Sequence, residues 1–305
     1  MALTVVIVLI VILIDELFFK KNDNNQKLLS PVTDFVSTGS SLPSHTAFLS
    51  ANSLETAVQN VLAGAQGNYA IAIFNLETAE SYYFAQHQSF QSASLYKLWI
   101  MATVYDQIQT GILQENDVLS QNLGVLDRKF LLASDSAQQR QGTITLAVSD
   151  ALNNMITLSD NDSALLLTER IRLSKVALFL ERYDFSESMV GLNGEIPTTT
   201  ASDIAIFFKK LYEGQLTNPE NTEKMLDLLK QQKLNEKLPK YLPSNIVIAH
   251  KTGELEDYSH DAGIVYSNDG DYVIVVLSKS DMPAAANEII AAISASVYNY
   301  FSRNE

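Results

Sequence analysis

Three short motifs in this chain combine hydroxyl and amine groups in a pattern suited to acyl transfer through a serine. They are Ser94-Leu95-Tyr96-Lys97, Ser159-Asp160-Asn161 and Lys251-Thr252-Gly253, each present once and in this order. A serine hydroxyl becomes a good nucleophile only when a base removes its proton, and an amine with a lowered pKa can be that base. Because the chain has no cysteine and only four histidines, serine and lysine are its natural nucleophile and base.

The spacing of the first motif places its two reactive groups on one face of a helix. Residues three apart in a helix lie about 5–6 Å apart at Cβ, so Lys97 can reach the Ser94 hydroxyl. The helix is predicted to begin at Ser94 and to run through Ile108, which leaves the Ser94 N–H unpaired in a partly positive field. Burial, or a neighbouring cation such as Lys251, would lower the pKa of Lys97. The alternative is that Ser94 is an N-cap and Lys97 a solvated residue of the first turn.

The second motif interrupts a helical region. It falls between a helical stretch that ends at Leu158 and another that begins near Asp162. Ser159 could relay a proton to a leaving nitrogen, and Asn161 could hydrogen-bond a substrate amide. The alternative is a capping turn, because Ser, Asp and Asn are all preferred there, and Asp160 could be a cap under either interpretation.

The third motif ends the apolar run of residues 245–250. Lys251 and Thr252 offer a charge and a hydroxyl to a substrate carboxylate, and the glycine that follows lets a substrate or another backbone approach closely. The N–H groups of Ser94 and Glu254 could together bind an oxyanion. The alternative is an ordinary exit from a strand into a turn.

Hydrophobic periodicity predicts the elements that must position these motifs. An amphipathic helix, Ser53–Leu62, precedes a hairpin of two strands, Tyr69–Asn75 and Ser81–Gln86, and residues 94–213 are mostly helical in period. A helix, three strands and a closing helix follow at Thr222–Gln232, Asn245–Lys251, Ala262–Ser267, Asp271–Lys279 and Ala284–Phe301. The predicted fold class is α/β of the α+β type: an antiparallel sheet flanked by N- and C-terminal helices, with an inserted all-helical domain.

The composition excludes several classes of function. The chain carries 21 Lys+Arg against 35 Asp+Glu, a formal net charge of −14, which argues against binding nucleic acid or docking on anionic lipid. The absence of cysteine excludes disulfides, thiolate metal sites and a cysteine nucleophile. We expect no metal and no cofactor, and we assign no chemistry to His45, His87, His250 or His260, of which the last two are expected to be structural. The sequence makes no prediction about oligomeric state.

The N-terminal 21 residues predict attachment to a membrane. Residues 2–14 are an unbroken apolar run, shorter than the roughly 20 residues that span a bilayer as a helix. The run resembles the apolar region of an export signal, without a basic flank before it or a small-residue cleavage site after it. A buried strand or helix is the alternative. We expect residues 1–21 to be an uncleaved anchor or signal-like segment and the polar residues 22–50 to be a flexible tether.

With these motifs in place, residues 51–303 resemble the class A β-lactamase-like serine hydrolases, a family that includes related penicillin-binding D,D-peptidases. His260–Val265 looks like the family's next strand, and Thr198–Thr200 looks like the start of the helix after its Ω loop. The resemblance implies a two-domain fold with the site between the sheet edge and the helical domain. The expected catalytic unit covers residues 51–305, with a sheet part at 51–90 and 215–305 and a helical part at 91–214.

The resemblance also implies the chemistry and the location. A β-lactam or a D-alanyl peptide of the cell wall would acylate Ser94, and water would then release the acyl group. The protein would be extracytoplasmic and bacterial, either secreted or held to the membrane by its N-terminal segment alone. The catalytic candidates are Ser94, Lys97 and Ser159, and the substrate-binding candidates are Asn161, Lys251, Thr252, Gly253 and Glu254.

One element of the family pattern is missing. The β-lactamases of this class carry a Glu-x-x-Leu-Asn stretch in the Ω loop, and its glutamate activates the deacylating water. Here Leu192-Asn193 is present, but Met189 stands where the glutamate belongs, and only four residues separate this pair from Thr198. Glu187 and Glu195 are nearby carboxylates at other spacings, with exposed loop residues as the alternative interpretation. We therefore expect slow deacylation, in a weak β-lactamase or a D,D-peptidase. A β-lactam receptor without turnover and an inactive wall-binding relative are the alternatives.

Overall fold

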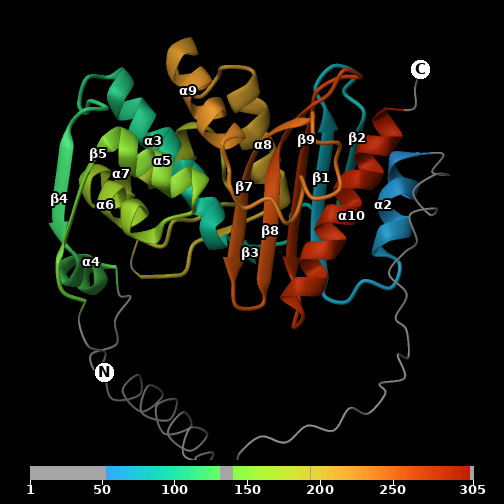
Figure 1. Cartoon of the computed structure of the whole chain (residues 1–305), viewed down its shortest axis with the longest axis horizontal. Helices are drawn as coiled ribbons and strands as arrows, with labels where there is room; N and C mark the ends of the chain where they lie inside the picture. The colour runs from blue at the N-terminus through green and yellow to red at the C-terminus, as the bar shows by residue number, and fades with distance from the viewer. Residues whose placement is uncertain (1–52, 131–139, 193, 303–305) are drawn as a thin grey trace, which may run out of the picture. The chain divides into compact units, whose positions relative to one another are not determined.

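The structure is a computed structural model that describes residues 53–130, 140–192 and 194–302 (Figure 1). The predicted anchor and tether, residues 1–21 and 22–50, lie outside these residues, and so does Asn193. Within the described ranges, no helix has both the length and the apolar character needed to cross a membrane.

A five-stranded sheet forms one half of the described chain (Figure 1). Its strand order is β2-β1-β9-β8-β7, so β7 is an edge strand. All four pairings are antiparallel, which confirms the predicted sheet. The central strand β9 is rich in valine and isoleucine and is buried along nearly its whole length, as expected for a strand covered on both faces. The strands are β1 (Asn68–Asn75), β2 (Ser81–Phe84), β7 (Val247–Leu255), β8 (Tyr258–Tyr266) and β9 (Tyr272–Lys279).

The helices α2 (Leu54–Leu62) and α10 (Pro283–Phe301) pack on one face of this sheet, as predicted for the terminal helices (Figure 1). The Ser53 side chain caps α2 by accepting a hydrogen bond from the Thr56 N–H at 3.1 Å. A proline occupies the first turn of α10, where its missing N–H costs no hydrogen bond. Apolar side chains from both helices and from the strands form one buried cluster that includes Val58, Ile71, Val276, Ile293 and Val297.

The other half is a lobe built around the helix α3 (Lys97–Gln109), which is almost wholly buried (Figure 1). A helix that is apolar on all sides is expected in the middle of a core. The lobe also contains a two-stranded antiparallel sheet, β4 (Val118–Asn122) with β5 (Thr143–Ala147), where the sequence period predicts only helices. The Thr-Ile-Thr run of β5 is β-branched, and such residues pack well on a pleated surface. The remaining helices are α4 (Leu123–Lys129), α5 (Val148–Thr157), α6 (Asn161–Ile171) and α7 (Leu173–Arg182).

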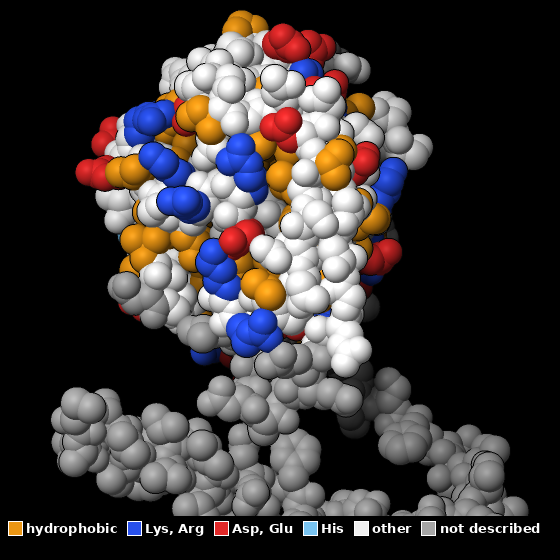
Figure 2. All heavy atoms as spheres, turned by 90° about the vertical axis from the view of Figure 1, so that its left-hand side faces the viewer, with side chains coloured by type: hydrophobic (Ala, Val, Ile, Leu, Met, Phe, Trp, Pro, Cys, Tyr) orange, Lys and Arg blue, Asp and Glu red, His pale blue; other side chains and the backbone are white. Residues whose placement is uncertain are grey.

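The outer surface of this lobe carries charges of both signs (Figure 2). Several of its basic side chains pair with carboxylates, and a pair that is exposed on both sides stabilises a fold by about 1 kcal/mol or less, whereas the carboxylate of Asp127 is buried. The pairs are Lys129 with Glu169, Arg140 with Asp127 and Asp162, and Arg182 with Asp106.

The inner face of the sheet and the helical lobe share one hydrophobic core. The helix α8 (Ala201–Tyr212) packs against β1, β8 and β9, and α9 (Pro219–Lys230) packs against β7 and α5. A short strand pair, β3 (Phe90–Gln91) with β6 (Thr198–Thr199), lies next to the entry of the chain into the lobe. Because close-packed interiors deform little, this continuous core holds the sheet edge and the lobe in one relative orientation.

Candidate active site

Ser94 lies where the chain enters the helical lobe. Residues Ala93–Tyr96 form a 3-10 turn that leads directly into α3. Ala93 has a φ of +44°, a left-handed conformation that is uncommon for a residue with a Cβ atom and is often found at functional sites. The Ser94 side chain is partly exposed. Its N–H belongs to the first turn, where helical donors have no partner within the helix.

Lys97, one turn later, is fully buried and its ammonium group has three acceptors. It donates to the Ser159 carbonyl at 2.5 Å, to Asn161 Oδ1 at 2.8 Å and to Ser159 Oγ at 3.2 Å. Burial lowers the pKa of Lys97 to about 8, although the Asp160 charge acts in the opposite direction. A lysine with this pKa can take a proton from a neighbouring hydroxyl near neutral pH.

Ser159 occupies the break between α5 and α6 with a φ of +58°, again left-handed. Its Oγ lies 3.2 Å from Lys97 Nζ and 2.9 Å from Lys251 Nζ. A hydroxyl that accepts from two amines keeps its own hydrogen to donate to a ligand. Asp160 is the N-cap of α6, where its carboxylate accepts from the Ser163 N–H at 2.7 Å.

Lys251 reaches the same hydroxyl from the sheet. It is fully buried, and it also donates to the Thr252 carbonyl at 2.9 Å. Burial, and then the charge of Lys97, lower the pKa of Lys251 well below its ordinary value. Thr252 is buried as well, so its hydroxyl can meet only a ligand that enters as deeply as Lys251.

The glycine of the third motif allows the sheet to approach the nucleophile. A Cβ atom on Gly253 would lie 3.2 Å from the Ser92 carbonyl oxygen and 3.3 Å from Ala93 Cβ. Only a residue without a side chain fits there without displacing the turn that carries Ser94. The third motif therefore lies directly against the two residues that precede Ser94.

Glu254 follows this glycine within β7, which continues to Leu255 instead of ending near Lys251 as the sequence predicts. The chain returns to β8 through a two-residue turn that Leu255 and Tyr258 close. In an antiparallel ladder, hydrogen-bonded and non-hydrogen-bonded residue pairs alternate. Leu255 and Tyr258 form the hydrogen-bonded pair that closes the turn, so the preceding pair, Glu254 and Ser259, is not hydrogen-bonded. The N–H of Glu254 therefore points away from β8, to the open edge of the sheet. This edge is the one that faces the lobe, as an oxyanion donor requires.

His260 joins the sheet to the segment that precedes Ser94. Its Nε2–H donates to the Gln91 carbonyl at 2.8 Å, and its Nδ1 accepts from the Ser278 N–H at 3.1 Å. Burial is the main cause that lowers its pKa to about 4, so the ring is neutral. This role could not be found in the sequence, because Gln91 contributes only a backbone carbonyl that any residue would supply.

The Glu187 carboxylate is held by two neighbours outside this group. It lies 2.9 Å from His87 Nδ1 and accepts from Thr200 Oγ1 at 2.7 Å. Burial raises the pKa of Glu187, but these hydrogen bonds outweigh it and leave the pKa below its ordinary value. The hydrogen bonds that join Lys97, Ser159, Asn161 and Lys251 do not include this carboxylate.

Glu195 lies in a short loop closed by Met189 and Thr198. The N–H of each closing residue donates to the carbonyl of the other, at 2.9 and 3.0 Å. Glu195 lines a cavity of about 1110 Å³ in the helical lobe, together with Tyr96 and Val190. The cavity lies beside the motif that contains Ser94, but Ser94, Lys97, Ser159 and Lys251 are not among its lining residues.

The arrangement supplies the parts of a serine acyl-transfer site. Three separated segments contribute a partly exposed hydroxyl, an amine with a lowered pKa, a bridging hydroxyl and a second buried amine. Groups of three or more His, Asp or Glu side chains that could hold a metal ion are absent from the described part of the chain.

Comparison with known proteins assigns the family. The family model described as the β-lactamase enzyme family matches residues 53–301. A comparison with curated proteins found no match.

Solved structures share the fold. The match to PBP-A has a TM-score of 0.71 and 22% identity over 82% of this chain and 96% of that one. An acyl-enzyme complex of a PBP-A variant with penicillin G matches with a TM-score of 0.71 and 24% identity over the same shares of the two chains. A β-lactamase from Sphaerobacter thermophilus matches with a TM-score of 0.70 and 22% identity over 82% of this chain and 97% of that one. These findings confirm the resemblance and the predicted fold, and the chain belongs to the β-lactamase enzyme family, a family of serine hydrolases.

Proposed function

We propose that this chain forms an acyl-enzyme at Ser94 by opening the amide bond of β-lactams, and that it releases the acyl group slowly. The observation that carries the proposal is the Ser159 hydroxyl, which accepts hydrogen bonds from both Lys97 and Lys251. Burying two amines around one hydroxyl is unfavourable for folding, so the arrangement is better explained by catalysis than by stability.

Acylation uses the groups nearest Ser94. The Ser94 oxygen attacks the carbonyl carbon of the lactam, and its proton passes to the neutral amine of Lys97. The lowered pKa of Lys97, about 8, keeps a useful fraction of this amine neutral near pH 7. The N–H groups of Ser94 and Glu254 stabilise the negative charge that develops on the carbonyl oxygen.

Collapse of the tetrahedral intermediate breaks the C–N bond. The leaving nitrogen takes a proton from Ser159, and Ser159 regains one from Lys97, which lies 3.2 Å away. Lys251 binds the substrate carboxylate, and the Thr252 hydroxyl, which alternation places on the other face of the edge strand β7, meets it from the edge. Asn161 donates its amide N–H to the substrate, because its Oδ1 already accepts from Lys97.

Slow release follows from the loop between Met189 and Thr198. Hydrolysis of the acyl-enzyme needs a base beside the attacking water, and the family's glutamate position holds Met189 here. Glu187 is engaged by His87 and Thr200. We therefore place this protein among weak β-lactamases.

A second candidate substrate is a D-alanyl peptide of the bacterial cell wall. The specific observation that favours it is the same loop, since a peptidase can transfer or release its acyl group without the missing glutamate. The fold likeness to PBP-A, a variant of which forms an acyl-enzyme with penicillin G, is compatible with either substrate. Both substrates fit an extracytoplasmic protein that is either secreted or anchored through residues 1–21. Both also fit a catalytic unit that is divided into the sheet part and the helical part predicted from the sequence.

Mass spectrometry after incubation with penicillin G tests the proposal. A stable adduct on the peptide that contains Ser94 is expected, with slow loss over time. The exposed Ser149 offers a matched control, because Ser149→Ala should leave the adduct unchanged. Rapid hydrolysis without an adduct would indicate an efficient β-lactamase, and cleavage of a D-alanyl peptide would favour the peptidase. An adduct that is never released would indicate a receptor. The enzymatic proposal is wrong if neither substrate is bound or cleaved.

A further inference from the structure

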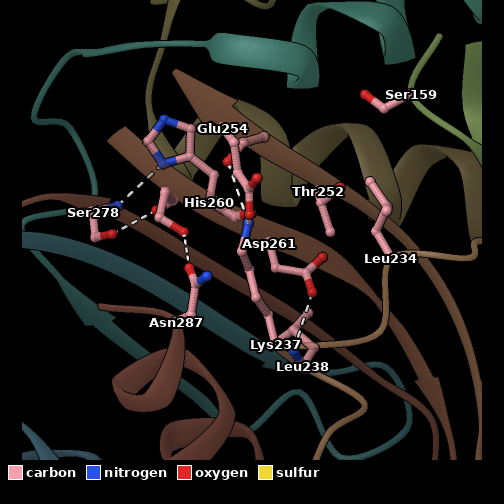
Figure 3. Close-up of polar contacts among 12 residues, drawn as sticks. Ser159, Leu234, Lys237, Leu238, Thr252, Glu254, His260, Asp261, Ser278 and Asn287 are labelled. Carbon is pink, nitrogen blue, oxygen red and sulfur yellow. Dashed lines mark hydrogen bonds and ion pairs between the residues drawn. The ribbon is translucent and has the colours of Figure 1, made fainter. Parts of the chain in front are cut away.

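Lys237 is a buried cation next to the third motif, and Figure 3 shows its side chain directed towards Glu254. It lies in the connection between α9 and β7, and its side chain is only 2% exposed. Its ammonium group donates to the carbonyls of His260 at 3.2 Å and Gly253 at 3.5 Å, and it lies 2.8 Å from the Glu254 carboxylate. Of these three partners of the Lys237 ammonium group, two are neutral carbonyls and the third, the Glu254 carboxylate, is charged.

Glu254 connects this buried cation with the proposed substrate site. Its backbone N–H is the one that we assign to the oxyanion, while its side chain is 65% exposed. Side chains alternate along a strand, so the Glu254 carboxylate projects to the face of β7 opposite Lys251. Because β7 is an edge strand, a carboxylate released from Lys237 could turn around the edge towards Lys251.

The segment that carries Lys237 is fixed on both sides. The Asn235 side-chain oxygen lies 3.2 Å from His250 Nε2, and the Leu238 N–H donates to Asp261 at 3.0 Å. His250 is itself buried and lies 2.9 Å from Asp261. Lys237 is therefore a fixed cation, and the exposed Glu254 is the partner that can move.

The pair of Lys237 and Glu254 lies within electrostatic reach of Lys251. Burial and the charge of Lys97 have larger effects on the pKa of Lys251, but Lys237 also lowers this pKa and Glu254 raises it. A carboxylate that moved closer to Lys251 would occupy the cation that the substrate carboxylate needs.

We propose that Lys237 is a positioning residue for acylation: by pairing with Glu254, it holds that carboxylate behind β7 and prevents it from competing with the substrate carboxylate for Lys251. The inference rests on the proposed function. It assigns Lys237 no contact with the substrate, and it predicts that loss of the pair weakens substrate binding more than the chemical step.

The test is the time course of penicillin G acylation in the full chain, which separates the dissociation constant of the non-covalent complex from the acylation rate constant. Lys237→Met should raise the dissociation constant by at least about tenfold, because two charges about 4 Å apart near a protein surface interact by more than the free energy of a tenfold change in affinity. The acylation rate constant should stay within about threefold. Adding Glu254→Gln to this variant removes the released charge and should restore binding. Lys233→Met, an exposed lysine four residues earlier, is the matched control and should bind as the wild type does.

A second variant covers the case in which Lys237→Met fails to fold. Glu254→Asp shortens the exposed side chain by one methylene, which breaks the 2.8 Å pair while keeping the negative charge, so it should weaken binding like Lys237→Met. A slower chemical step with unchanged binding, or no rescue by Glu254→Gln, would overturn the inference. A wild type that forms no adduct would overturn the proposed function and the inference together, whereas an acylating wild type with unaffected variants would overturn the inference alone.

Discussion

Two regions border the segment that carries Ser94, and they differ in burial and in hydrogen bonding. On one side Lys97, Ser159 and Lys251 join in a group whose two amines are fully buried. On the other side runs the loop closed by Met189 and Thr198, and the Ser92 N–H donates to the Pro197 carbonyl of this loop at 2.8 Å. The apolar side chains of Met189, Leu192 and Ile196 are about half exposed there.

This difference suggests that the two halves of the reaction depend on separate parts of the molecule. In the proposed function, the first region supplies the base and the proton relay that Ser94 needs to form an acyl-enzyme. The second would have to activate water, but Glu187 is bound to His87 and Thr200, and Glu195 lines the cavity of the helical lobe. A chain of this kind can acylate efficiently and deacylate poorly.

The largest effect is expected for Ser94→Ala. Removal of the hydroxyl that forms the covalent bond should abolish acylation by penicillin G, measured as the loss of the mass adduct. The free energy of unfolding should change by less than about 1 kcal/mol, because the side chain is partly exposed. An adduct that persists on another residue would contradict the proposed site.

A large effect is also expected for Lys97. If its neutral amine is the base, the acylation rate should rise with pH and reach half its maximum near pH 8, because deprotonation of the lysine creates the active form. Lys97→Met should slow acylation about 10³-fold.

Lys97→Arg is the matched control, since it keeps the positive charge but cannot lose its proton near pH 8. It should be as slow as Lys97→Met, and its acylation rate should be independent of pH in this range. A variant with arginine that acylates at the rate of the wild type would show that Lys97 is not the base.

The pH dependence of stability tests the role of His260, which links the sheet to the segment that precedes Ser94. Its pKa is about 4 in the folded protein, against an ordinary value of 6.5. Below pH 6.5 the unfolded chain takes up a proton that the folded chain does not bind until about pH 4. The free energy of unfolding should therefore fall by about 3 kcal/mol as the pH drops from 6.5 to 4.

His260→Gln should remove this part of the pH dependence, as measured by urea unfolding at several pH values. The variant should also be about 2 kcal/mol less stable at pH 7, because it loses buried hydrogen bonds to Gln91 and Ser278. An unchanged difference between pH 6.5 and pH 4 would show that His260 is not the titrating group.

A smaller effect, a gain in the deacylation rate, is expected for Met189→Glu. This change restores a carboxylate at the family's glutamate position, and we expect it to accelerate release of the penicilloyl group about tenfold without changing acylation. The decay of the adduct, followed by mass spectrometry, measures the effect. Met189→Gln is the matched control, and equal acceleration by both variants would rule out a base at this position.

The smallest effect is expected for Glu187→Gln. Its carboxylate is bound to His87 and Thr200, so the deacylation rate should change by less than about threefold. Glu195→Gln, measured in the same way, tests the second carboxylate of this region. A drop of a hundredfold or more in either variant would identify the missing base and remove the contrast between the two regions.

The sequence by itself determined the elements and the types of reactive group. The three-residue spacing of Ser94 and Lys97 defines one face of a helical turn, and apolar runs bounded by turn residues define strands. The antiparallel sheet, the terminal helices and the break at Ser159 could be predicted for this reason. The pair β4–β5 and the full length of β7 could not, since the existence and the extent of a strand depend on the partner strand with which it pairs.

Only the tertiary structure decided which groups meet. The Ser159 hydroxyl lies 62 residues from Lys97 and 92 from Lys251 in the sequence, and the shared core brings the three together. The pKa of each lysine follows from its burial, which no local pattern specifies. The pairing of Lys237 with Glu254 is set in the same way, because the packing of distant segments fixes distances that sequence spacing leaves open.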